Sequence, residues 1–128
     1  MSEPLPTMTL NSASVKPKGL VMLREAIENS FYKCNRSIVV YVDVDDTIMD
    51  HNDIPKMHVI NALKDAKSSG CKLYLWSQGG AEYCKKYADT FGISYLFSGF
   101  LDKPDIVIDD LEVKASFIDR WIHPIQLL

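Results

Sequence analysis

The chain has 128 residues, of which 47% are hydrophobic and 24% charged, and its formal net charge is −3 at pH 7. This length fits one domain with a single core, and the composition excludes disorder along the whole chain. The longest apolar run, residues 37–42, is far shorter than a membrane-spanning helix needs, so we expect no membrane partner. The acidic balance does not support a nucleic-acid partner, because phosphate binding normally requires a basic excess.

The cysteines bear on the cellular compartment. Cys34, Cys71 and Cys84 are too few, and too far apart, for a disulfide framework or a zinc site. The first residues also lack the charged start and apolar stretch of a secretory signal, so we expect a cytoplasmic location. Cys84 falls on the apolar side of a predicted helix, where we expect it to be a small core residue.

The N-terminal part divides into two segments. Residues 1–17 are rich in proline, serine and threonine, which predicts a flexible arm. Residues 18–36 are expected to be a helix and a linker, because apolar residues recur there at spacings of three and four. The apolar stripe consists of Leu20, Leu23, Ile27 and Phe31. We expect this helix to pack on the core. A further hypothesis is that the N-terminal part either covers the functional site or mediates assembly, for example as a homo-oligomer.

From residue 37 onwards, β-rich runs alternate with helical patterns. Strands are predicted at residues 38–42, 72–76, 94–97 and 105–108, and helices at residues 55–69, 81–91 and 111–121. Such short connections between strands and helices indicate parallel pairing through right-handed crossovers. The predicted fold is therefore a three-layer, Rossmann-like α/β domain, with a parallel sheet flanked by helices on both faces.

Polar residues gather where the predicted strands end, which is where open parallel sheets bind ligands. Three groups follow a predicted strand: residues 43–47 (DVDDT), residues 77–80 (SQGG) and the Asp109-Asp110 pair. The fourth group, Lys103 with Pro104, stands just before the last predicted strand, and on this fold model we expect all four to meet at one rim of the sheet. Crowded carboxylates repel one another, and a divalent cation relieves that repulsion. Oxygen ligands favour magnesium, and the lysine and a hydroxyl would complement a phosphate that bridges to the metal.

These four motifs, in this order, resemble those of the haloacid dehalogenase (HAD) superfamily of phosphohydrolases. The resemblance covers residues 37–128 and implies a HAD-like catalytic domain that hydrolyses phosphomonoesters with Mg²⁺. It implies that Asp43 is the nucleophile, which forms an aspartyl-phosphate, and that Asp45 is the general acid and base. Ser77 and Lys103 would bind the phosphoryl oxygens. The implied metal ligands are the carboxylate of Asp43, the backbone carbonyl of Asp45, and Asp110, with Asp109 in support.

The resemblance also bears on the reaction and on the substrate. An acid at position 45 favours ester hydrolysis over dehalogenation, whereas Asp46 replaces a glycine that is frequent in this loop of the family. The intervals between the motifs are already filled by predicted core elements, so we expect no cap domain. An open site fits a phosphorylated substrate, either a small phosphate ester or a macromolecular phosphate.

Three other interpretations compete with a phosphatase. A calcium-binding EF-hand loop is disfavoured, because Ile48 and Ile54 stand where that loop needs glycine and glutamate. A response-regulator receiver domain is also disfavoured. In such domains the acidic pair comes first and the lysine follows the last strand, whereas here Lys103 precedes Asp109-Asp110. A non-catalytic, phosphate-binding regulatory module on the same fold is the third interpretation, and turnover of an aryl phosphate would distinguish it from an enzyme.

Overall fold

The computed structural model describes residues 18–31 and 36–128. The elements, in chain order, are α2 (Lys18–Phe31), β1 (Val39–Asp43), α3 (Met57–Ser68), β2 (Lys72–Ser77), α4 (Ala81–Thr90), the 3-10 turn η1 (Ser94–Leu96), β3 (Phe97–Asp102), β4 (Ile106–Ile108), β5 (Arg120–Ile122) and the 3-10 turn η2 (Pro124–Leu127). The protein is therefore of the mixed α/β class, as the alternating pattern predicts. The predicted flexible arm, residues 1–17, lies outside the described residues, as does part of the predicted linker, residues 32–35.

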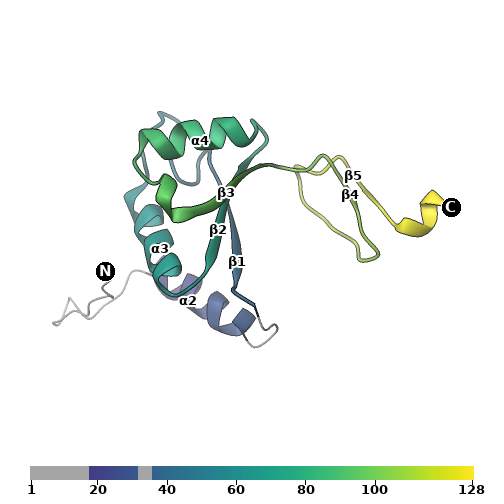
Figure 1. Ribbon diagram of the computed structural model, residues 1–128, viewed down its shortest axis with the longest axis horizontal. Coiled ribbons are helices and arrows are strands. Elements are labelled where there is room, and N and C mark those ends of the chain that lie inside the picture. The colour runs from purple at the N-terminus through teal and green to yellow at the C-terminus, as the bar shows by residue number, and fades with distance from the viewer. Residues whose placement is uncertain (1–17, 32–35) are drawn as a thin grey trace.

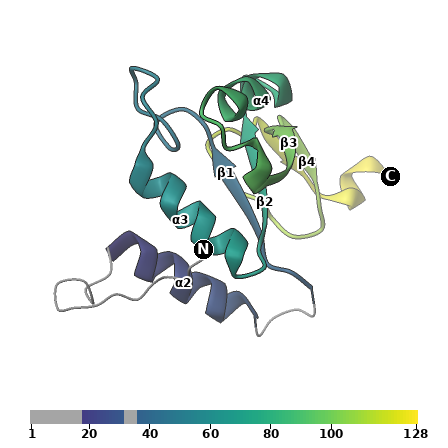
Figure 2. The ribbon, with the colours of Figure 1, turned by 60° about the vertical axis from the view of Figure 1, so that its left-hand side comes forward.

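The first three strands form one parallel sheet in the order β1-β2-β3. Both connections, through α3 and α4, step across this sheet in the same direction. Because parallel crossovers are right-handed, both helices come to lie on the same face, as Figure 1 shows. The helix α2 packs against α3, where Arg24 and Asp65 form an ion pair of 2.6 Å (Figure 2).

The core lies between the sheet and these helices. Leu73 and Leu75 alternate with Tyr74 and Trp76 along β2, so that the two leucines are fully buried under the helices. Cys84 on α4 is also fully buried and has a free thiol, as the sequence predicts. Its pKa is raised to about 11, first by burial and then by the negative charges of two nearby aspartates, so it is a core side chain and not a nucleophile.

The prediction of three layers is wrong for the described chain, because helices cover one face of the sheet only. The other face carries a row of aromatic side chains. Tyr41 and Trp76 meet edge to face, with ring centroids 4.6 Å apart, and Phe117 meets Trp76 at 5.0 Å. A side chain at Gly99 would lie 3.2 Å from the ring of Tyr74, so glycine at this position leaves room for that ring. Tyr41 remains about half exposed.

The last strands form a second sheet. β4 and β5 are parallel and pair with each other, and they project away from the first sheet in Figure 1. The predicted helix at residues 111–121 is wrong, since this stretch is a loop followed by β5. The backbone N–H groups of Asp119 and Arg120 donate to the carbonyl oxygen of Asp105, at 2.7 and 3.3 Å, which holds the stretch extended beside β4.

Other predicted elements are present with shifted bounds. The strand predicted at residues 94–97 is η1 followed by β3, because the apolar run continues to Leu101. The helix predicted at residues 55–69 is α3, which begins after Lys56 and ends at Ser68. Gly70, two residues beyond its end, has a φ of 96°, a left-handed conformation that glycine adopts freely after a helix. No helix in the described part of the chain has the length and the apolar character that crossing a bilayer requires.

Candidate functional site

Asp43 is the last residue of β1 and lies at the centre of the candidate site. Its Oδ1 atom is 2.8 Å from Nζ of Lys103, and its Oδ2 atom accepts a 3.0 Å hydrogen bond from the hydroxyl of Thr47. Lys103 directly follows β3, and its backbone N–H donates to the carbonyl oxygen of Ser77 at 2.9 Å. The ends of the three parallel strands thus bring three of the four predicted polar groups together. Both oxygens of Asp43 have a fixed partner.

Lys103 is held in a mostly covered position. Its side chain is 13% exposed, and its ammonium group lies 4.7 Å from the ring centre of Phe117 and 5.7 Å from that of Trp76. Aromatic faces attract cations, so these rings help to hold the ammonium group in place next to Asp43. Phe117 comes from the loop between β4 and β5, and sequence reasoning did not place it at the site.

Ser77 ends β2 and is buried, with 2% of its surface exposed. Its Oγ atom accepts a 2.9 Å hydrogen bond from the backbone N–H of Gly79, and its carbonyl oxygen accepts one from Gly80 at 3.2 Å. These bonds close a tight turn ahead of α4, in which Gly80 has a φ of 104°. Among the hydrogen bonds of the described residues, none uses the hydroxyl proton of Ser77.

Asp102 also belongs to the site, although no sequence motif indicated it. It pairs with Ser77 in the sheet register, and its Oδ1 atom accepts a 2.5 Å hydrogen bond from the backbone N–H of Ala81. Ala81 is the first residue of α4, so this carboxylate satisfies a donor at the positive end of the helix. The N–H group of Ala81 is therefore already engaged and is not free to bind an anion at this helix start.

Asp45 lies two residues beyond Asp43 and has an exposed side chain. Its Oδ1 atom accepts a 2.6 Å hydrogen bond from the hydroxyl of Tyr83, on α4. This bond favours the protonated phenol, and together with burial it raises the pKa of Tyr83 well above its usual value. Asp46, next in the chain, has a φ of 59°, a left-handed conformation that aspartate tolerates and glycine adopts freely.

The loop from residue 44 to residue 56 is well organised. Ile48 and Met49 are buried in the core and anchor it. Oδ1 of Asp50 accepts hydrogen bonds from the backbone N–H groups of Asn52 and Ile54, at 2.8 and 3.0 Å. These bonds favour the charged carboxylate and hold the pKa of Asp50 below its usual value. The backbone of the loop that carries Asp45 is therefore held in place by these contacts.

The fourth predicted group, Asp109 and Asp110, is not brought to Asp43. Asp109 follows β4, and its backbone is bonded to the β5 region: its N–H donates to Ile122 at 3.1 Å, and its carbonyl oxygen accepts from the Trp121 indole at 2.8 Å. Its side chain accepts a hydrogen bond from the Leu111 N–H, which holds the pKa of Asp109 below its usual value. The expectation that all four groups meet at one rim is wrong here, because β4 pairs with β5 and not with β1.

The magnesium site that the resemblance implies would draw on residues of both sheets. Within the part of the chain that the structure describes, no group of three or more histidine, cysteine, aspartate or glutamate side chains is placed to hold a metal ion. Asp43 and Asp45 lie at one sheet, and Asp109 and Asp110 at the other. As they are arranged here, the predicted ligands do not fit a magnesium ion.

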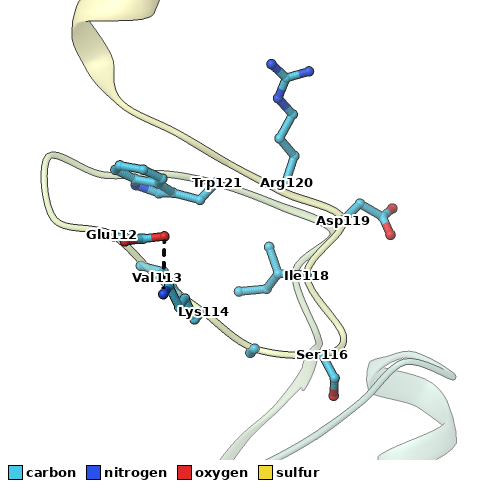
Figure 3. Close-up of a pocket in the computed structure, with 9 residues that line it drawn as sticks. Glu112, Val113, Lys114, Ser116, Ile118, Asp119, Arg120 and Trp121 are labelled. Carbon is cyan, nitrogen blue, oxygen red and sulfur yellow. Dashed lines mark ion pairs between the residues drawn. The ribbon is translucent and has the colours of Figure 1, made fainter.

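A separate hollow lies in the C-terminal part of the chain. Figure 3 shows it between the strand β5 and the loop that precedes it, with Ile118 and Trp121 among its lining residues. Its volume is about 650 Å³, and it is widely open to solvent. The lining includes neither Asp43 nor Lys103, so this hollow is not the predicted phosphate site.

Comparisons with known proteins give no relative for this chain. No protein-family model, no curated protein and no solved structure matches it. Fold-level analogy therefore cannot supply a function, which has to be argued from the chemistry of the site itself.

Proposed function

We propose that this protein is a HAD-type phosphomonoester hydrolase with Asp43 as its covalent nucleophile. The observation that carries the proposal is the carboxylate of Asp43, fixed between the ammonium of Lys103 and the hydroxyl of Thr47 at the ends of parallel strands. A positive charge beside a carboxylate allows it to approach an anionic phosphate. A second carboxylate, Asp45, stands two residues away and supplies the acid that such a reaction needs.

The proposed reaction has two steps. In the first, an oxygen of Asp43 forms a bond to phosphorus, the ester P–O bond breaks, and Asp45 gives its proton to the leaving oxygen. In the second, Asp45 takes a proton from a water molecule that attacks phosphorus, and the bond between Asp43 and phosphorus breaks to release inorganic phosphate. Splitting one displacement in this way replaces a difficult step with two easier ones.

The remaining rim residues bind the phosphoryl group in this proposal. Lys103, whose ammonium lies beside Asp43, would bind oxygens of the phosphoryl group whose phosphorus Asp43 attacks, and the hydroxyl proton of Ser77 is available to donate. The substrate is a phosphorylated compound, either a small ester or a macromolecular phosphate. The free, buried thiols of Cys71 and Cys84 agree with a reducing cytoplasm as the place of action.

The HAD-type arrangement is part of the proposal and requires a movement of β4. The strand β1 pairs with β2 on one side only, so its outer edge is free among the described strands. Ile106 and Ile108 of β4 are each more than half exposed, and an added strand at that edge would bury part of them. Addition of β4 beside β1 would bring Asp109 and Asp110 toward Asp43. Magnesium would be bound only in that arrangement, and neither of the two proposed steps depends on it.

The experiment is hydrolysis of para-nitrophenyl phosphate, with and without Mg²⁺, by the full chain and by the Asp43→Asn variant. This change removes the nucleophile at constant volume, so we expect turnover to be abolished while the fold is kept. Asp46→Asn is the matched control, because it makes the same chemical change in an exposed side chain three positions away, and we expect it to remain active. Activity of Asp43→Asn above about a tenth of wild type would contradict the proposal, since covalent catalysis cannot survive loss of its nucleophile.

A non-catalytic, phosphate-binding module is the second candidate. It is favoured by the metal-ligand geometry, since the described residues do not assemble a magnesium site. In that case the protein binds inorganic phosphate in a calorimetric titration, loses this binding in Lys103→Met, and hydrolyses no aryl phosphate. Turnover by the wild-type chain that is lost in Asp43→Asn excludes this candidate.

A further inference from the structure

Two tyrosines on α4 reach across to two aspartates in the loop of residues 44–56. The hydroxyl of Tyr83 donates to Oδ1 of Asp45 at 2.6 Å, and that of Tyr87 donates to Oδ2 of Asp53 at 2.9 Å. The tyrosines are four residues apart and so share one side of the helix, where their rings meet edge to face at 5.1 Å. Two hydrogen bonds thus connect α4 to the loop. Only the one from Tyr83 to Asp45 involves a residue with a proposed role in catalysis.

The ring of Tyr83 is also in contact with the turn that carries Ser77. A side chain at Gly79 would lie 3.1 Å from Cγ of Tyr83 and 3.4 Å from Oγ of Ser77. The absence of a side chain at position 79 therefore allows the ring to lie against the turn. Tyr83 connects two parts of the proposed site, the phosphate-binding turn and the acid Asp45.

Asp45 depends on this contact for its orientation. Its side chain is exposed, and among residues 18–31 and 36–128 the phenol of Tyr83 is the one hydrogen-bond partner of its carboxylate. The bond occupies Oδ1 and leaves Oδ2 to carry the proton for the leaving group. Without Tyr83, this side chain would sample several rotamers, and only some of them would point at the substrate.

We infer that Tyr83 is the positioning residue for the general acid and base, holding Asp45 in the orientation from which Oδ2 transfers its proton. This inference rests on the proposed function, since it assigns a role in the same reaction. It goes beyond the sequence motifs, which contain no tyrosine. The hydroxyl acts through Asp45 and does not itself touch the reacting atoms.

The test compares Tyr83→Phe with the matched control Tyr87→Phe. Each change removes one hydroxyl and keeps the ring, so the packing on Gly79 and between the two rings is preserved. Two substrates are used: an alkyl phosphate, whose leaving group needs a proton, and para-nitrophenyl phosphate, whose leaving group needs little assistance. For Tyr83→Phe we expect kcat on the alkyl phosphate to fall about tenfold with unchanged KM. Little change is expected on the aryl ester, or for Tyr87→Phe on either substrate.

A double-mutant cycle with Asp45→Asn isolates the coupling. If Tyr83 acts through Asp45, then Tyr83→Phe causes no further loss when Asp45→Asn is already present. Equal losses in Tyr83→Phe and Tyr87→Phe, or a loss of the same size on both substrates, would overturn the inference. Either result is what a hydrogen bond with a purely structural role would give. A Tyr83→Phe variant with the same kcat as wild type on both substrates overturns the inference about Tyr83 and leaves the proposed function intact. A wild-type chain that hydrolyses neither substrate overturns the proposed function and this inference together.

Discussion

The two sheets of this protein differ in how they are supported. Every buried residue of the described chain lies between Val42 and Phe97, in the part formed by β1, β2, β3 and their helices. The part formed by β4, β5 and η2 has no buried residue, and Ile106, Ile108 and Leu111 are each more than half exposed. Both parts contain parallel strands, but an isolated two-stranded pair is at best marginally stable in water. Burial under helices, more than strand pairing, makes the first part self-supporting.

The same difference separates the polar groups of the site. Asp43 and Lys103 lie at the ends of β1 and β3 in the first sheet. Their side chains form an ion pair, and the ammonium of Lys103 lies over the ring of Phe117. Asp109 and Asp110 stand in the part that lacks a core. A site that needs all four groups therefore depends on stabilisation of the part that contains β4. The proposed means is pairing of β4 with the edge of β1, which is free among the described strands.

The largest difference between the two parts is expected in stability. Leu75→Ala opens a cavity in the core and should lower the free energy of unfolding by about 2–5 kcal/mol, because Leu75 is fully buried. Ile108→Ala, the matched change in the exposed strand, should lower it by about 0.5 kcal/mol or less. Urea denaturation followed by circular dichroism measures both. A loss of more than about 2 kcal/mol for Ile108→Ala would show that β4 is buried in solution.

A second measurement tests whether β4 joins the first sheet. The carbonyl of Ile38 accepts from the N–H of Lys72 in β2, so by alternation the backbone N–H of Tyr41 points to the free edge. We expect the Tyr41 amide to exchange rapidly with deuterium in the metal-free protein and at least tenfold more slowly with Mg²⁺. The amide of Val42, which faces β2, is the internal control and should change little. Equal exchange of Tyr41 with and without Mg²⁺ contradicts the proposed movement.

The smallest effect concerns acid stability. The pKa of Asp50 is lowered in the folded state by the N–H groups of Asn52 and Ile54. Its contribution is therefore present above its unfolded pKa of about 3.9 and is lost as the pH falls through the lower, folded value. Asp50→Asn should lower the urea midpoint at pH 6 and have little effect near pH 2.

Asp109→Asn is the matched control for the acid-stability measurement. The pKa of Asp109 is also lowered, chiefly by the backbone N–H of Leu111, but this aspartate lies in the part without a core. We expect the midpoint of Asp109→Asn to stay near that of wild type at both pH values. Equal sensitivity of Asp50→Asn and Asp109→Asn would indicate that the two parts unfold as one unit.

The sequence predicts the supported part well, and for a physical reason. The β-rich runs of β1 and β2 are local signals, and they place the ends of these two strands within one residue, whereas the third predicted strand ends five residues before β3 does. Because parallel strands end at one edge, Lys103 after β3 lies beside Asp43 at the end of β1, although the sequence placed it only ahead of the last predicted strand. The motif residues of these three strands are the ones that the structure brings together.

The remaining features depend on distant contacts that carry no local pattern. The segment 111–121 was predicted to be a helix, but its backbone bonds to Asp105 keep it extended. The reach of Tyr83 to Asp45 spans 38 positions, and no periodicity in α4 indicates which loop its hydroxyl meets. The sequence only partly indicates the role of Asp102. An acidic residue at a strand end can cap the next helix, but the helix that Asp102 caps precedes it in the chain.

The packing of Phe117 on Trp76 gives the molecule an optical consequence. Trp76 lies on the open face of the first sheet, with Phe117 at 5.0 Å and the ammonium of Lys103 5.7 Å from its ring. Indole emission responds to nearby charge and to solvent, so any displacement of the loop that carries Phe117 changes the fluorescence of Trp76. In a Trp121→Phe background, where it is the one remaining indole, Trp76 becomes an intrinsic reporter of events at Lys103 that needs no attached dye.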